Sequence, residues 1–250
     1  MRDFGEADAL ALMRAQNEPG ETVVRLVRGE IEGEPTDIPG AYGVARVDEA
    51  ALAEGRIWPQ SRASQLAALA VGSREGERIL DSCAAPGGKA TMLHGDVAAV
   101  ELNEGRAREL EENARRLGAT NVTVVRADAT DLPAELRDFD RALVDAPCSG
   151  LGVLGRRPDL RWRARPLPDL QLALLRAAAE RVKPGGTIVY SVCTLNADEN
   201  EAVVEASGLE IDPTLADEWP RFRHPRRPEF LLTMPHLHRT SGFFIARLRA

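Results

Sequence analysis

The chain has 250 residues, of which 44% are hydrophobic, and this length is enough to bury the core of one large domain. Charged and apolar residues interleave throughout, which excludes a disordered chain, and no apolar run is long enough to span a bilayer. The net charge of −7 argues against a uniformly basic nucleic-acid-binding protein. Because the first residues carry no apolar leader, we expect a protein that is neither secreted nor bound to membranes.

Three cysteines lie at positions 83, 148 and 193, widely spaced and without a Cys-x-x-Cys pair. This pattern excludes a disulfide framework and a zinc ribbon, and we expect no metal site. Unpaired thiols are typical of the reducing cytoplasm. We therefore expect a cytoplasmic protein in which each thiol has its own explanation.

Charge is distributed unevenly along the chain. Residues 1–56 carry 12 acids and 6 bases, whereas residues 150–250 carry 15 bases and 12 acids. Nearly all bases are arginine, whose planar guanidinium suits phosphate groups. Two interpretations stay open for the arginine clusters, a nucleic-acid-binding surface or a solvated face. The clusters are Arg156, Arg157, Arg161, Arg163 and Arg165, then Arg221, Arg223, Arg226 and Arg227.

Residues 1–56 are predicted to form a small, partly irregular lobe. Apolar residues at helical spacing lie within 9–13, and residues 22–27 have the composition of a strand. Glycine and proline then recur through residues 29–43, which indicates loops. We expect residues 57–250 to form the second, larger domain.

From about residue 60 the pattern alternates strand and helix. Ser61 is a candidate helix cap, and Gly118 follows an amphipathic helix as a good terminator. Apolar strands separated by helices predict an α/β fold with a parallel sheet covered on both faces. The predicted strands are 78–81, 96–101, 121–125, 141–144, 187–190 and 242–246, and the predicted helices are 104–117, 170–182 (stopped by residues 183–186) and 197–206.

Ligands of such sheets bind at the carboxyl ends of the strands. Because each lies at or just past a predicted strand end, five side chains are expected along one edge: Asp81, Glu101, Asp128, Asp145 and Cys193.

The loop after the first of these strands carries the strongest short motif, Asp-Ser-Cys-Ala-Ala-Pro-Gly-Gly-Lys-Ala at residues 81–90. Its glycines let a ligand approach the backbone closely. It is not a Walker loop, because Cys83 and Ala90 stand where that loop needs Gly and Ser or Thr. With Glu101 placed to accept hydrogen bonds from ribose hydroxyls, the pattern predicts an adenosine-containing cofactor. The alternative is a tight turn without a ligand.

Four motifs in this order resemble the Fmu/Sun (RsmB-like, NOP2/Sun) family of RNA cytosine-5 methyltransferases. They are the loop at 81–89, Asp-Ala-Pro-Cys-Ser-Gly at 145–150, Tyr-Ser-Val-Cys-Thr at 190–194 with Glu199-Asn200 behind it, and Ser-Gly-Phe-Phe at 241–244. The resemblance runs from about Gln60 to the C-terminus. It implies a class I methyltransferase (Rossmann-like) fold, with a mostly parallel seven-stranded sheet, and S-adenosylmethionine as cofactor.

The chemistry of such an enzyme requires a cysteine. Carbon 5 of cytosine is a poor nucleophile, and attack of a thiolate at C6 makes it reactive enough to accept a methyl group. Cys148 and Cys193 both follow strands at the expected site edge. The chemistry alone does not distinguish them, because DNA cytosine methyltransferases use the cysteine of a Pro-Cys motif. A plain alternative is that buried cysteines serve as small hydrophobic residues, which we prefer for Cys83.

The resemblance implies roles for individual residues. Cys193 would be the nucleophile, Cys148 would assist release of the adduct, and Asp145 would contact and activate the base. Glu101 would hold the ribose and Asp128 would face the adenine. Lys89 is expected to anchor Asp145 or another nearby acid, and Arg106 is either a cofactor contact or a solvated arginine. The implied cofactor-binding residues are Cys83, Ala84, Ala85, Pro86, Gly87, Gly88, Lys89, Glu101, Arg106, Asp128 and Asp145.

The chain departs from the family pattern at four places. Glu101, Val192 and Ser241 stand where the family usually has Asp, Thr and Asp. The helix after the first loop is expected to be short, because Gly95 follows Lys89 so closely. None of these changes removes a reacting atom.

The resemblance implies RNA as the partner, with small-subunit ribosomal RNA preferred over transfer RNA, and we expect a monomer. Trp162, within the first arginine cluster, either stacks on a base or anchors a loop in the core. His236 and His238 give only a weak metal signal and are expected at the surface. Rival functions are a catalytically silent RNA-binding or ribosome-assembly factor, and a methyltransferase for small molecules or proteins. Residues 1–56 are expected to be a remnant of the family's small RNA-binding lobe, with no room for a NusB-like domain.

Overall fold

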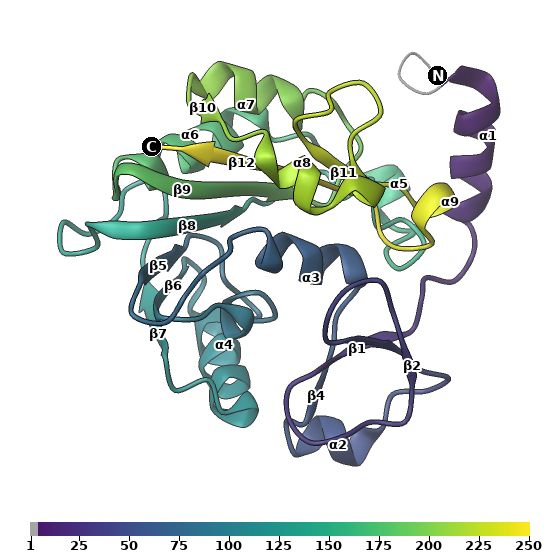
Figure 1. Ribbon diagram of the computed structural model, residues 1–250, viewed down its shortest axis with the longest axis horizontal. Coiled ribbons are helices and arrows are strands. Elements are labelled where there is room, and N and C mark those ends of the chain that lie inside the picture. The colour runs from purple at the N-terminus through teal and green to yellow at the C-terminus, as the bar shows by residue number, and fades with distance from the viewer. Residues whose placement is uncertain (1–4) are drawn as a thin grey trace.

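A computed structural model describes residues 5–250 of the chain; residues 1–4, on which part of the expectation of no leader rests, lie outside it. The chain forms a four-stranded sheet near its N-terminus and a larger sheet, on which most of the remaining helices pack (Figure 1). Within the described residues no helix combines the length and the apolar character needed to cross a membrane.

The N-terminal part begins with a helix, α1, whose main contacts are not with the small sheet that follows it in sequence. Helix α1 packs against α9 from the far end of the chain, and the two lie side by side in Figure 1. The small sheet is antiparallel, in the order β2-β3-β1-β4, around a core of Val24, Ala51 and Ile57. Its last strand lies beyond the expected boundary at residue 56. The elements are α1 Gly5–Ala15, β1 Val23–Leu26, β2 Glu34–Pro35, β3 Ala41–Gly43, α2 Glu49–Ala53 and β4 Ile57–Pro59.

Five parallel strands form the centre of the large sheet in the order β7-β6-β5-β8-β9. Strand β12 then pairs antiparallel with β9, and its other edge is shared by two short strands, β10 and β11. The expected seven-stranded, mostly parallel sheet is therefore confirmed as seven positions, the last of which holds two strands. The bounds are β5 Arg78–Asp81, β6 Asp96–Glu101, β7 Val122–Arg126, β8 Phe139–Asp145, β9 Val182–Val192, β10 Glu210–Ile211, β11 Leu231–Thr233 and β12 Phe243–Arg249.

Helices cover both faces of this sheet (Figure 1). On one face α3 contributes Leu66 to a buried cluster with Ile79 of β5, and α4 contributes Leu110 to a cluster with Ala99 of β6. On the other face α6 and α7 bury Leu175 and other residues against the sheet. The helical segments are α3 Arg62–Leu69, η1 Ala90–Met92, α4 Glu104–Leu117, α5 Leu160–Arg163, α6 Pro168–Ala179, α7 Glu201–Ser207, α8 Thr214–Glu218, η2 Pro220–Phe222 and α9 Pro235–His238.

Helix ends follow local signals. Ser61 caps α3 by accepting a hydrogen bond from the Ser64 amide, as expected. Helix α4 has the predicted bounds, because Asn103 caps its first turn and Gly118 ends it in a left-handed conformation with φ of 73°. The short helix expected after the first loop is the single 3₁₀ turn η1.

Several predicted bounds are wrong. The predicted helix 170–182 runs from Pro168 to Ala179, because Val182 already belongs to β9, and the predicted strand 141–144 runs from Phe139 to Asp145. Strand β9 begins at Val182 rather than 187: Val182 pairs with Phe139, and residues 183–186 then bulge out before the ladder resumes. The predicted helix 197–206 begins later, at Glu201. Strand β12 continues to Arg249, because β9 pairs along its length.

A candidate active site at the carboxyl ends of the parallel strands

Two adjoining cavities lie at the carboxyl ends of β5, β6, β8 and β9. The first, here called the Glu101 cavity, measures about 470 Å³ and is lined by Glu101, Asp128, Cys148 and others. The second, the Lys89 cavity, measures about 320 Å³. Both are lined by five residues, Cys83, Ala85, Asp145, Val153 and Cys193. The predicted edge residues are therefore brought together, with Cys193 in the wall between two cavities.

The glycine loop after β5 is wedged between α4 and the small sheet. A Cβ at Gly87, where φ is +105°, would lie 2.8 Å from Leu110 Cδ1. A Cβ at Gly88 would lie 2.8 Å from the indole nitrogen of Trp58. Either contact would force the neighbouring side chain to move, and at Gly87 the positive φ also favours glycine. Gly87 lines neither cavity, whereas Ala84, Pro86, Gly88 and Lys89 line the Lys89 cavity.

Side chains from outside the loop hold its carbonyl groups. Arg106 donates to Ala85 O at 2.8 Å and Asn113 donates to Pro86 O at 2.8 Å. Arg25 of β1 donates to Gly88 O at 3.0 Å, and burial lowers its pKa to about 10. Sequence reasoning missed Arg25; its only signal was a charged residue inside an otherwise apolar strand.

Lys89 forms the ion pair that was conjectured from sequence. Its Nζ lies 2.6 Å from Asp145 Oδ2, and Ser191 donates to Asp145 Oδ1 at 2.7 Å. Burial lowers the pKa of Lys89, but the Asp145 carboxylate more than offsets this and the net pKa is raised. The lysine therefore stays cationic and fixes the orientation of the Asp145 carboxylate.

The two cysteines that follow β8 and β9 are in contact, with 3.4 Å between their sulfur atoms. The hydrogen bond from Cys148 lowers the pKa of Cys193, assisted by the Lys89 charge and opposed by burial and Asp145. The same contact raises the pKa of Cys148. Burial raises the pKa of Cys83, which lies beside them in the cavity wall. This arrangement favours a thiolate at Cys193 and a protonated thiol at Cys148.

A buried carboxylate behind the cysteines holds their loops together. Glu199 is fully buried, and its Oε1 accepts from the Ser149 amide at 2.9 Å and from Gln171 Nε2 at 3.0 Å. The loop that carries Cys148 is thus tied to the loop that follows Cys193. The sequence motif included Glu199, but gave no reason for it.

Gly152 closes the same loop onto Cys193. Its amide donates to Cys193 O at 3.0 Å, and its carbonyl accepts from the Gly242 amide at 2.8 Å. A Cβ at Gly152 would lie 2.0 Å from Gly242 O, so any other residue would displace the loop.

Glu101, Arg106 and Asp128 line the Glu101 cavity as a group. Glu101 is buried and accepts from the Asn103 amide at 2.8 Å, with Arg106 Nη1 3.4 Å from its other oxygen. Asp128 is exposed, and hydrogen bonds from the Thr130 hydroxyl and amide hold its pKa below the usual range. Arg106 thus contacts the cavity, and is not simply a solvated arginine.

Three residues before and within α3 also line the Lys89 cavity, Trp58, Gln60 and Ser64. The indole of Trp58 lies against the Arg116 guanidinium at 5.2 Å. Gln60 donates to Ser64 Oγ at 3.2 Å, while its buried Oε1 has no hydrogen-bond partner within the described residues. Sequence reasoning missed these residues, because they become site residues only when the small sheet packs on the large one.

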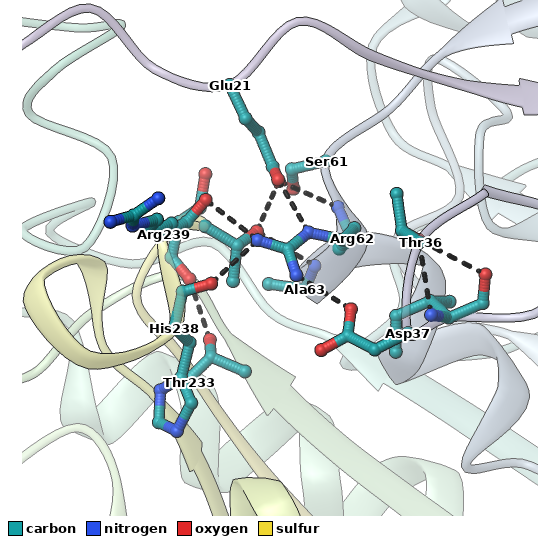
Figure 2. A network of polar contacts seen from close by, with 12 residues as sticks. Glu21, Thr36, Asp37, Ser61, Arg62, Ala63, Thr233, His238 and Arg239 are labelled. Atoms are coloured by element: carbon teal, nitrogen blue, oxygen red, sulfur yellow. Dashed lines mark hydrogen bonds and ion pairs between the residues drawn. The ribbon is translucent and has the colours of Figure 1, made fainter. Parts of the chain in front are cut away.

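Arg62 joins the two sheets from the start of α3 (Figure 2). Its guanidinium contacts Glu21 at 2.7 Å and Asp37 at 2.7 Å in the N-terminal part. It also donates to the carbonyls of His238 at 2.6 Å and Arg239 at 2.8 Å. This network fixes the wall of the Lys89 cavity near Ser61.

The two arginine clusters differ in structure. In the first, Arg161 donates to Gln16 O at 2.8 Å, and Trp162 is 83% exposed, so a core role for Trp162 is wrong. Carboxylates pair with arginines in both clusters, and in the first Arg157 contacts Asp159 at 3.0 Å. In the second, carboxylates pair with several arginines, which favours the interpretation as a solvated face. The pairs are Arg221 with Asp37 at 3.2 Å, Arg223 with Asp217 at 2.7 Å and Arg227 with Glu229 at 2.7 Å.

The histidines do not form a metal cluster. His238 is buried, contrary to the expected surface position, because its Nδ1 accepts from the Met234 amide at 2.8 Å. His236 lies apart from His238 and lines a third cavity. Within residues 5–250 there is no group of three or more His, Cys, Asp or Glu side chains suited to a metal ion.

The strand order and the site at the strand ends define a class I methyltransferase fold. The family model described as 16S rRNA methyltransferase RsmB/F matches residues 68–249, and the chain belongs to this family. The resemblance drawn from the four sequence motifs is thereby confirmed.

Curated relatives agree on this family. The chain is 37% identical over 214 residues to a probable ribosomal RNA small subunit methyltransferase B of Bacillus subtilis, covering 78% of this chain and 48% of that protein. It is 36% identical over 215 residues to a tRNA (cytosine(72)-C(5))-methyltransferase of Pyrococcus horikoshii, covering 80% and 54%. The chain therefore spans about half the length of the curated relatives it matches.

Solved structures share the fold over nearly the whole chain. A methyltransferase homologue from Pyrococcus horikoshii superposes with a TM-score of 0.83 at 26% identity, covering 99% of this chain and 92% of that one. NSun6 from the same organism, solved with SFG, superposes with a TM-score of 0.82 at 24% identity, covering 99% and 95%.

Proposed function

We propose that this protein transfers a methyl group from S-adenosylmethionine to C5 of a cytosine in RNA, through a covalent bond between Cys193 and C6 of the base. The observation that carries the proposal is that Cys193 lines both cavities and that its sulfur contacts a second thiol. This reaction needs the methyl donor and the cytosine to lie on either side of one nucleophile.

The Glu101 cavity fits the cofactor. The buried carboxylate of Glu101 ends β6 and can accept hydrogen bonds from ribose hydroxyls, and Asp128 lies in the same cavity. Ser82 Oγ in this cavity, and Asp81 Oδ2 in the lining of the adjoining Lys89 cavity, are buried without partners among the described residues. Both would accept hydrogen bonds from the ammonium or another donor of the methionine part. When bound, S-adenosylmethionine supplies an electrophilic methyl group on a sulfonium.

The Lys89 cavity fits the pyrimidine. Asp145, held by Lys89 and Ser191, would face the N3–N4 edge of the base and favour its protonated, activated form. The Cys193 thiolate forms a bond to C6, which turns C5 into a nucleophile that takes the methyl group. Loss of the C5 proton and breaking of the C6–sulfur bond then restore the aromatic ring. The raised pKa of Cys148 keeps its thiol protonated, and its sulfur lies 3.4 Å from the Cys193 sulfur. Cys148 is therefore placed to assist the departure of Cys193.

The preferred substrate is small-subunit ribosomal RNA, which follows the family model and the relatives named as ribosomal methyltransferases. Transfer RNA is the second candidate, favoured by the 36% identity to a transfer-RNA enzyme. The exposed Trp162 supplies a stacking face two residues after Leu160, which lines the Glu101 cavity together with Arg157. Bisulfite sequencing of RNA from cells with and without the protein would identify the cytosine.

The two thiols can be tested with RNA that contains 5-fluorocytosine, in which fluorine cannot leave as a proton. We expect a stable covalent complex that Cys193→Ala abolishes. Cys148→Ala should retain attack and accumulate adduct on ordinary RNA. Adduct formation by Cys193→Ala would reverse the two roles. Calorimetric titration with S-adenosylmethionine provides the control, since a catalytically silent factor need not bind it.

A further inference from the structure

A third cavity lies beside the Lys89 cavity and has no part in the chemistry described above. This His236 cavity measures about 670 Å³ and lies between α1, the connection 16–21, the loop 152–156 and α9. It shares Val153, Arg156 and Ser241 with the Lys89 cavity, so the two adjoin. A volume of this size is in the range of small-molecule sites.

The rim of the His236 cavity carries unpaired positive charge. Arg14 and Arg239 are exposed residues in its lining, and no hydrogen bond or ion pair holds either guanidinium within residues 5–250. The backbone of Arg239 is in a left-handed conformation, with φ of 52°, while Arg62 holds its carbonyl. Figure 2 shows the Arg239 side chain directed away from that network. Arg239 ends α9 in this left-handed conformation, as residues at helix C-termini commonly do.

The floor of the cavity combines apolar surface with one unsatisfied aromatic ring. Ala11, Ala15 and Pro235 supply apolar atoms. Both ring nitrogens of His236 are buried and have no partner in the described part of the chain. Burial lowers the pKa of His236, so its ring is neutral at pH 7, with one donor and one acceptor. Such a floor suits the face and edge of a nucleobase.

Three arginines and two acids, Glu18 and Glu21, line the cavity, so its lining keeps an excess of positive charge. Glu21 lines the cavity, but its carboxylate is used by Arg62 and by the Thr240 hydroxyl. Arg156 adds a third guanidinium at the junction with the Lys89 cavity, and donates to the Glu21 carbonyl. All three arginines thus line the His236 cavity, and Arg156 also lines the Lys89 cavity.

We propose that the His236 cavity binds the nucleotide next to the target cytosine in a single strand of RNA, with its base over the apolar floor beside His236 and its phosphate towards Arg14, Arg156 and Arg239. This inference rests on the proposed function. It assigns the cavity as a second nucleotide subsite, which gives the enzyme both affinity and a preference for the flanking base.

Crosslinking from a trapped complex tests this position. A short RNA would carry 5-fluorocytosine, with 4-thiouridine on its 5′ side or, in a second RNA, on its 3′ side. After trapping on Cys193, illumination should crosslink the thiouridine of one of the two RNAs to α9 or α1, as mapped by mass spectrometry. Crosslinks found only elsewhere, for example on α5 at Trp162, would overturn the assignment of the His236 cavity as the second nucleotide subsite. Absence of the trapped complex itself contradicts the proposed function instead.

Charge reversal gives an independent measurement with the full chain. Arg14→Glu and Arg239→Glu should each weaken binding of a hexacytidylate RNA about fivefold or more, and reduce the salt dependence by about one counterion. His236→Ala should weaken binding without changing the salt dependence. Arg46→Glu is the matched control, because Arg46 is exposed and lines none of the three cavities. Unchanged RNA affinity in the arginine variants, with wild-type cofactor binding, overturns the inference and assigns the cavity to another ligand such as a protein segment.

Discussion

At the scale of single residues, the three cysteines of one site differ in pKa: one is favoured as a thiolate and two as protonated thiols. Contact with Cys148 lowers the pKa of Cys193, the same contact raises the pKa of Cys148, and burial raises the pKa of Cys83. The environment of each thiol, and not the thiol itself, decides which one can act as the nucleophile.

Removal of the Cys148 thiol should therefore make Cys193 less reactive. In Cys148→Ala we expect the pH profile for alkylation of Cys193 by iodoacetamide to shift to higher pH, because the hydrogen bond to the thiolate is lost. Mass spectrometry of the labelled peptide measures the rate. Cys83 serves as the internal control and should stay unlabelled in both proteins. An unchanged profile would show that Cys148 does not stabilise the thiolate.

A second residue-scale prediction concerns Asp81. Burial, with the Asp145 charge nearby, raises its pKa from 3.8 to about 7. Because its pKa is higher in the folded than in the unfolded protein, Asp81 contributes most to the stability of the ligand-free protein below pH 4. This contribution, on the order of 4 kcal/mol, is lost as the pH rises towards 7. Asp81→Asn should thus match the wild type in thermal stability near pH 4 and exceed it at pH 8. Denaturation at both pH values measures this, and an equal difference at both would contradict it.

At the scale of elements, two loops position the thiols, and both depend on long-range contacts. Glu199 accepts amide hydrogens from the loop after β8, and Gly152 donates to the Cys193 carbonyl after β9. These loops have no regular structure of their own. Their geometry follows from a buried acid and from close backbone packing.

Glu199→Gln replaces one carboxylate oxygen by an amide group that cannot accept hydrogen bonds. We expect a loss of about 1–3 kcal/mol in the free energy of unfolding, because the Ser149 hydroxyl or amide is left unsatisfied. The rate of trapping by 5-fluorocytosine RNA should fall as well. Urea unfolding and the trapping assay measure the two effects, and a variant with wild-type values in both would contradict the role of Glu199.

Gly152→Ala should slow trapping more than it reduces cofactor affinity. Its Cβ would overlap the Gly242 carbonyl, and the loop between Cys148 and Cys193 would have to move. Gly105→Ala is the control: it lies in α4, its Cβ would be 3.4 Å from Asn103 Oδ1, an ordinary contact, and it should stabilise the helix by about 0.5–1 kcal/mol. Equal trapping rates for Gly152→Ala and wild type would exclude the proposed loop geometry.

At the scale of the whole molecule, the acidic N-terminal part is bound to the large sheet by buried arginines. Arg62 contacts Glu21 before β1 and Asp37 between β2 and β3, as well as carbonyls near the C-terminus, and Arg25 reaches the glycine loop. The Lys89 cavity lies between these contacts. The small sheet is thus part of the site and not only an appendage to it.

Arg62→Met should destabilise the protein by about 3–5 kcal/mol, because Glu21 and Asp37 would be left as partly buried acids without their partner. Urea unfolding measures the change. Arg46→Met, at an exposed position, is the control and should differ from wild type by about 0.5 kcal/mol or less. A small effect of Arg62→Met would show that the two parts are held together by other contacts.

The sequence by itself determined the features that depend on neighbouring residues. The bounds of α4 follow from Asn103 and Gly118, and the reactive residues could be placed at strand ends because strand, turn and helix signals are local. The four motifs identified the family for the same reason.

Tertiary structure alone decided which side chains meet. Trp58, Gln60 and Arg25 became part of the site through packing of the small sheet on the large one, and residues 183–186 bulge because β8 dictates the register of β9. The sequence also did not show that arginines of the second cluster pair with acids. Such contacts join residues far apart in the chain, and their energies depend on burial and geometry that no local pattern contains.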